Sequence, residues 1–166
     1  KDHVHAAASY IVDGGYKLLD LDGTRTTWGR WEPEFVPIAV DGPDKCNFTP
    51  DCLMSWGGGG WLNATEALGM MLAAWHITED PKFYDSYKYL IKMHYGDMAM
   101  PNQDTATITQ PAIANHSDHE LAMLAYTTLL RYEPDDAQRA KWIESLMFLY
   151  DHERIERNPW WTAVAS

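Results

Sequence analysis

The chain has 166 residues and a mass of 19.0 kDa, which suits one domain with a hydrophobic core, so we predict a single domain over residues 1–166. Its 13 Lys and Arg against 24 Asp and Glu give a net charge of −11, which disfavours nucleic acid and anionic membrane surfaces as partners. The longest apolar stretches, such as 68–75, are too short to cross a bilayer, so no membrane insertion is expected.

The first part of the chain combines one helix with extended and irregular structure. Apolar spacing predicts a helix over residues 2–12, ended by a pair of glycines. The hairpin-turn signal Asp22-Gly23 and the Thr- and Trp-rich residues after it predict a small β-hairpin over 16–31. Residues 32–61 have no helical period, several prolines and a glycine run, and predict a long loop.

Four helices are predicted in the second part of the chain. Their starts are expected near Asn63 or Thr65, at Pro81, at Asn115 or Ser117, and at Asp135 or Asp136, with the last helix running to about Arg157. The turns at 79–81 and 133–136 are tight, whereas the loops 32–61 and 95–115 are long. Antiparallel helical hairpins would therefore gather both long loops at one end, where a site would be built.

The two cysteines, Cys46 and Cys52, are separated by five residues that include a proline. This spacing predicts a disulfide-closed loop, and hence an oxidising compartment, so the protein is expected to be secreted or periplasmic. The alternative is two free thiols. No second pair of ligands lies at zinc spacing and no phosphate- or dinucleotide-binding motif occurs, so neither a metal nor a cofactor is predicted.

The first candidate site is a segment rich in carboxyls and aromatic rings. Glycoside hydrolysis needs one protonated and one ionised carboxyl, and tryptophan faces stack on sugars. The predicted catalytic carboxyls are Asp20, Asp22, Glu32 and Glu34, and the predicted substrate contacts are Arg25, Trp28 and Trp31. The alternative is turn chemistry, with Asp22 starting the hairpin and Asp20 paired with Arg25.

A second candidate site lies at a predicted helix start. His116 and His119 are spaced to share a helix face and are predicted as catalytic residues, as a sugar-cleaving lyase needs a His or Tyr base. The alternative is a polar helix terminus with favourable acidic residues. Near the C-terminal end, at most one of the adjacent Trp160 and Trp161 can be a stacking platform, and Trp160 is predicted to bind substrate.

Several motifs resemble bacterial secreted proteins with a six-hairpin (α/α)6 toroid, similar to glycoside hydrolases and polysaccharide lyases. The main motif is Gly-Tyr-x-Leu-x-Asp-x-Asp-Gly-x-x-Thr-x-Trp-Gly-x-Trp-x-Pro-Glu over residues 15–34, and further matches lie at 62–66, 78–84, 116–122 and 156–161. The resemblance implies an all-α fold of antiparallel helical hairpins. Twelve helices do not fit in 166 residues, so a partial toroid is expected, with faces left open that favour a homo-oligomer.

The sequence therefore predicts a carbohydrate partner and a glycoside hydrolase-like activity that uses acid and base carboxylates. A non-catalytic carbohydrate-binding or assembly module is the main alternative, because the active cleft of a toroid draws residues from many hairpins. A polysaccharide lyase is the third.

Overall fold

The computed structural model describes residues 1–24, 26, 31–33, 60–93, 95–99, 116–154 and 157–166. Its helices are α1 (Asp2–Asp13), α3 (Gly60–Thr78), α4 (Pro81–Lys92), α5 (Tyr95–Met98), α7 (His116–Tyr132), α8 (Asp136–Glu153) and α9 (Pro159–Ala165). The predicted all-α class is confirmed. Within these ranges β structure is limited to an isolated bridge at Leu19, so the small β-hairpin is not confirmed.

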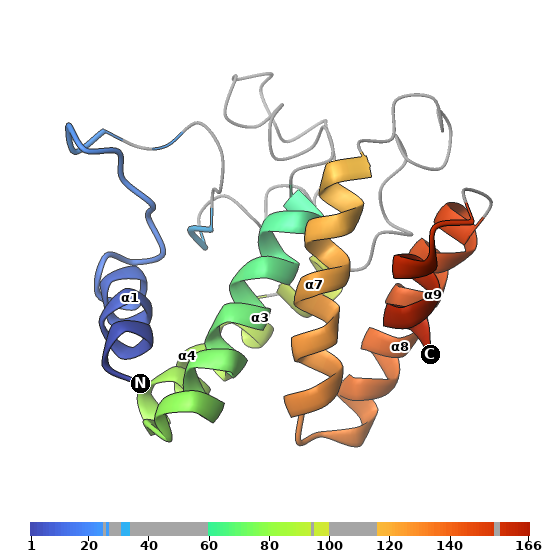
Figure 1. Ribbon diagram of the computed structural model, residues 1–166. Coiled ribbons are helices and arrows are strands. Elements are labelled where there is room, and N and C mark those ends of the chain that lie inside the picture. The colour runs from blue at the N-terminus through green and yellow to red at the C-terminus, as the bar shows by residue number, and fades with distance from the viewer. Residues whose placement is uncertain (25, 27–30, 34–59, 94, 100–115, 155–156) are drawn as a thin grey trace.

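The helices form antiparallel hairpins, as the loop lengths predict. In Figure 1, α3 and α7 lie side by side and run in the same direction, and each reverses through a short turn into α4 and α8, respectively. Both turns lie at the lower end of the view. The first residues of α3 and α7 lie together at the opposite end.

Local capping explains where the second helix of each hairpin begins. The Asp80 carboxylate accepts a hydrogen bond from the backbone N–H of Lys82 at 2.9 Å, and Pro81 occupies the first helical position. Asp135 caps α8 in the same way, accepting from the backbone N–H of Gln138 at 2.8 Å. Both predicted starts are confirmed.

Other predicted boundaries are wrong. Helix α3 begins at Gly60, before the expected caps, and the Thr65 hydroxyl bonds back to the Trp61 carbonyl at 2.7 Å. Buried Trp61 and Leu62 extend the apolar face into the predicted loop, so packing overrides the capping signal. Helix α8 ends at Glu153, and the short helices α5 and α9 were not predicted.

The core is centred on α3 and its contact with α7. Gly69 packs so closely on Ala125 that a Cβ added to the glycine would lie 3.3 Å from both the Cβ and the carbonyl oxygen of Ala125. Each fully buried large apolar side chain along this contact stabilises the fold by about 1.5–3 kcal/mol. The buried residues of α3 include Leu68, Met71 and Leu72, and those of α7 include Met123, Tyr126 and Leu129.

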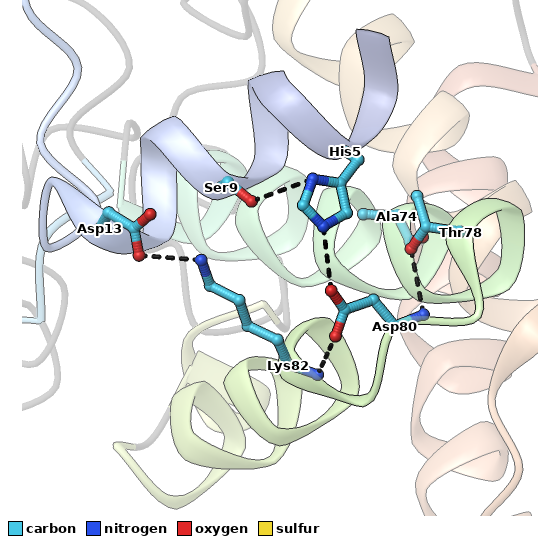
Figure 2. A network of polar contacts seen from close by, with 7 residues as sticks. All are labelled: His5, Ser9, Asp13, Ala74, Thr78, Asp80 and Lys82. Carbon is cyan, nitrogen blue, oxygen red and sulfur yellow. Dashed lines mark hydrogen bonds and ion pairs between the residues drawn. The ribbon is translucent and has the colours of Figure 1, made fainter. Parts of the chain in front are cut away.

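Helix α1 is attached across the α3–α4 turn. Nε2 of His5 lies 2.9 Å from the Asp80 carboxylate, and the Lys82 ammonium donates to the Asp13 carboxylate at 2.8 Å (Figure 2). The apolar contacts of α1 come from buried Ala8 and Ile11 and from half-buried Val4 and Val12.

Candidate functional site

The first two turns of α3 and the first turn of α7 bring acidic and aromatic side chains together at the end of the hairpins opposite the short turns. We call this group the helix-start cluster. Its members are Trp31, Trp61, Glu66, Asp118, His119 and Glu153.

The protonation of Glu66 is altered by its surroundings. Burial raises the pKa of its carboxyl, and the nearby negative charge of Asp118 raises it further. The Trp31 side chain, whose buried indole N–H makes no hydrogen bond among the described residues, lowers the pKa of Glu66 and is outweighed. Glu66 therefore holds its proton to a higher pH than an exposed glutamate, which is the property of a general acid.

His119 and Glu153 form a buried pair between α7 and the last turn of α8. Nδ1 of His119 contacts a Glu153 carboxyl oxygen, and only 2% and 3% of the two side chains are exposed. The Trp61 ring lies against the imidazole, with centroids 5.9 Å apart at 53°. A carboxylate only accepts hydrogen bonds, so the pair orients the imidazole and fixes the start of α7, which also carries Asp118.

Residues 31–33 are fastened to the helices beside this cluster. The buried Tyr95 hydroxyl, from α5, donates to the Trp31 carbonyl, and the adjacent Glu32 side chain is completely buried. The Tyr126 hydroxyl of α7 donates to the carbonyl of Ala99, just after α5. Of the predicted catalytic residues, Glu32 and His119 therefore lie in buried positions on the helical body.

Asp20 and Asp22 lie in an exposed turn. The Gly23 N–H donates to the Asp20 carbonyl at 2.9 Å, and the Asp22 carboxylate accepts from the backbone N–H and hydroxyl of Thr24 at 2.9 and 2.6 Å. These bonds hold the pKa of Asp22 below its usual range. The extended alternation that would place both carboxyls on one face is absent because the chain turns here, and the alternative prediction for Asp22 matches this geometry. A catalytic role for either residue stays a prediction.

Of the remaining predicted site residues, Trp160 lies in the described part of the chain and the others lie outside it. Trp160 is 38% exposed and Trp161 is buried, so only the first presents an open face, as expected. Asn158 sets this arrangement by capping α9 through a bond from the Trp160 N–H at 3.0 Å. Outside the described residues lie Arg25, Trp28, Glu34, Cys46, Cys52 and the side chain of His116.

Sequence reasoning did not select Glu66, Asp118 or Glu153 as site residues. Asp118 stands in the first turn of α7, and the predicted start near Asn63 or Thr65 placed Glu66 in a first turn as well, although the structure places it in the second turn of α3. Acidic residues in first turns are ordinarily explained by the helix dipole. One pattern in the sequence could have indicated Glu66 and Asp118: each lies near a predicted helix start that follows one of the two long loops. Glu153 had no signal, because it meets His119 across 34 residues of sequence.

Within the described residues, no three His, Cys, Asp or Glu side chains are grouped so as to hold a metal ion. No helix there is both long and apolar enough to span a membrane. No protein-family model, curated protein or solved structure matches the chain.

Proposed function

We propose that this chain is a carbohydrate-active protein of the glycoside hydrolase type, acting on an oligo- or polysaccharide with acid and base carboxyls. The observation that carries the proposal is the environment of Glu66, whose raised pKa arises from burial and from Asp118. Hydrolysis of a glycosidic bond needs one carboxyl that keeps its proton and one that is ionised. Glu66 takes the first role and Asp118 the second.

In this reaction Glu66 gives its proton to the glycosidic oxygen as the bond to the anomeric carbon breaks. Asp118 either takes a proton from the attacking water, or attacks the anomeric carbon to form a glycosyl ester that water then hydrolyses, with the ionised Glu66 taking the proton of that water. Trp31, a half-buried member of the same cluster, supplies an aromatic surface for the sugar. The His119–Glu153 pair holds the α7 start, and so Asp118, in place.

We also propose the architecture and the compartment that the sequence predicts, a partial toroid in a secreted or periplasmic protein. Two parallel helices, each followed by an antiparallel partner, support part of an (α/α) toroid. Such a partial toroid would associate with itself, and would be secreted or periplasmic with a Cys46–Cys52 disulfide. Trp28 keeps its predicted role as a second sugar contact.

The test is hydrolysis of a panel of neutral oligosaccharides, measured as reducing-end release, by the wild type, Glu66→Gln and Glu120→Gln. Glu120 is an exposed glutamate of α7 and is the matched control. Loss of a general acid lowers kcat by about 10²–10⁴-fold. We expect that loss in Glu66→Gln alone, together with disappearance of the alkaline limb of the kcat profile, because activity falls when Glu66 ionises. Equal turnover by Glu66→Gln and wild type would contradict the proposal.

The second candidate is a non-catalytic carbohydrate-binding module, favoured by the exposed face of Trp160. Such a module binds oligosaccharide, loses binding in Trp160→Ala and releases no reducing ends. A lyase, the third candidate, would generate unsaturated products that absorb in the near ultraviolet. It is less favoured because its predicted base, His119, is buried against Glu153.

A further inference from the structure

Helix α8 is apolar on its outer side as well as on the side that faces the core. Its inner side chains, among them Trp142 and Leu149, are completely buried. Ile143 and Met147, by contrast, are 50% and 40% exposed, and Ala140 is exposed as well. Residues that follow one another at steps of three and four share a helix face, so these three side chains form one stripe, which we call the α8 stripe.

The α8 stripe lies at the edge of the molecule. In Figure 1, α8 is at the right-hand side of the array of helices, beyond α7, and the described helices that it packs against most are α7 and α9. A helix with apolar residues on both sides is ordinarily covered on both sides. The spacing of the stripe is also the one by which two helices pack along a shared seam. These properties favour another helix as the occupant.

Ion pairs stand at both ends of the α8 stripe. Near the start of α8, the Asp136 carboxylate lies 2.9 Å from the Arg139 guanidinium. Near its end, the Asp151 carboxylate lies 3.3 Å from the Arg154 guanidinium. The outermost charge is therefore negative at one end and positive at the other, and both outermost side chains are largely exposed.

The arrangement is complementary to itself. Asp136 and Arg154 are equally far from Ser145 in the sequence, and so are Ile143 and Met147. If two α8 helices lie antiparallel across a twofold axis level with Ser145, Asp136 meets Arg154 of the partner subunit and Ile143 meets Met147 of the partner subunit. Opposite charges then face each other at both ends. A parallel pair of helices would instead bring like charges together.

We propose that the α8 stripe binds a second copy of this chain, as an antiparallel twofold dimer. The inference rests on the self-association in the proposed function and deepens it by naming the surface and the symmetry, but it uses no step of the hydrolysis. A twofold contact closes at two copies, whereas a ring of copies uses two different faces. The apolar side chains supply the affinity, and the exposed charges fix the orientation.

The first experiment is sedimentation velocity on the full chain over a concentration series, with the wild type, Met147→Glu and Leu124→Glu. Leu124 is a 51% exposed apolar residue of α7 and is the matched control. We expect the wild type to dimerise and the dissociation constant of the dimer to rise at least about tenfold in Met147→Glu alone, because that variant buries an unpaired charge in the contact. A monomeric wild type, or equal weakening in both variants, overturns the proposal.

The orientation is tested with Asp136→Arg and Arg154→Glu, with circular dichroism to check that each variant keeps its helix content. Each variant alone places like charges at both ends of the antiparallel contact and should dimerise more weakly than the wild type. Their equimolar mixture should recover dimerisation, because the two variants present opposite charges to each other. Unchanged dimerisation of either variant alone, or no recovery in the mixture, overturns the proposal.

A third outcome separates this inference from the wider proposal. An assembly larger than a dimer that persists in Met147→Glu overturns the α8 stripe as the contact but leaves self-association itself standing. None of these measurements uses a sugar, so their failure is distinct from failure of the proposed hydrolysis.

Discussion

Glu133 lies in the turn between α7 and α8 and is only 1% exposed. Its carboxylate accepts hydrogen bonds from three donors. It accepts from the Tyr87 hydroxyl of α4, from the Trp142 indole N–H of α8 at 3.2 Å, and from the backbone N–H of Asp135 at 3.1 Å. A buried charge is tolerated where its oxygens are satisfied in this way. Glu133 therefore joins the two hairpins at the end remote from the helix-start cluster.

Replacing Glu133 by alanine should destabilise the protein strongly. Tyr87 and Trp142 would each keep a buried donor without its acceptor, and together this costs about 2–5 kcal/mol of unfolding free energy. Urea unfolding followed by circular dichroism measures it. Glu144→Ala, at an exposed position of α8, is the control and should change stability by less than about 0.5 kcal/mol. Similar losses in the two variants would contradict this role.

Individual residue roles were only partly predictable from sequence. Trp161 as a packing residue followed from its position beside Trp160. The burial of Glu32 and the pairing of His119 with Glu153 did not, because both depend on which distant segments meet. A local pattern gives the chemistry that a side chain can offer, whereas its solvation is decided by tertiary contacts.

At the scale of elements, α1 is attached along one side by residues spaced four and eight apart. Lys1 lies 3.9 Å from Glu79, while His5 contacts Asp80 and, two turns further on, Asp13 contacts Lys82 (Figure 2). Positions at this spacing share a helix face. Exposed ion pairs contribute little stability, so packing of the apolar side of α1 supplies most of it and the pairs fix its register.

Asp80 allows these two contributions to be separated. Asp80→Ala removes both the α4 cap and the contact with His5, whereas Asp80→Asn keeps an oxygen that can accept from the Lys82 N–H. We expect Asp80→Ala to lower the urea midpoint clearly and Asp80→Asn to lower it much less. An equal loss would show that the ion pair outweighs the cap.

The pH dependence at Asp80 has a definite sign. The Lys82 N–H, and secondly His5, hold the pKa of Asp80 below its usual range. Its stabilising effect is therefore present above the ordinary aspartate pKa and is lost as the pH falls through the lowered folded value. The difference in midpoint between wild type and Asp80→Asn should accordingly shrink in acid.

Helices whose starts carry a capping pattern were predicted from the sequence, whereas short helices without a periodic pattern were not. Pro81 after Asp80, and Asp135 before Asp136, are capping patterns that work independently of the rest of the fold. Helix α5 has only four residues, too few for a periodic pattern, and α3 gains its first turn from buried Trp61. The hairpin arrangement itself followed from the contrast between short and long connections.

For the whole molecule, three buried tyrosines make stability sensitive to alkaline pH. Burial is the largest cause that raises the pKa values of Tyr16, Tyr87 and Tyr126 above the usual value of 10.0. In the unfolded chain these phenols ionise near that value, whereas in the folded chain they keep their protons. Above about pH 10 the folded state therefore binds more protons than the unfolded state. The free energy of unfolding keeps its full value below about pH 10 and decreases as the pH rises above it.

The expected decrease is about 1.4 kcal/mol per pH unit for each tyrosine that stays protonated only in the folded state. Urea unfolding at several values between about pH 8.5 and 11 measures the slope. Tyr126→Phe should reduce this slope by the contribution of one tyrosine, whereas replacement of the exposed Tyr10 by phenylalanine should leave the slope unchanged. A slope that Tyr126→Phe does not alter would contradict the prediction.

The close contact between Gly69 and Ala125 has a consequence for the cluster above it. Gly69 lies three residues after Glu66, and Ala125 lies two turns after Asp118, so this contact sets how far apart α3 and α7 run as they reach the two carboxyls. In enzymes that cleave glycosidic bonds, carboxyls about 5 Å apart retain the anomeric configuration, whereas a wider spacing admits water and inverts it. A methyl group at position 69 would spread the helices, so in the proposed hydrolysis by Glu66 and Asp118 the absence of a side chain there restricts the stereochemical course of the reaction.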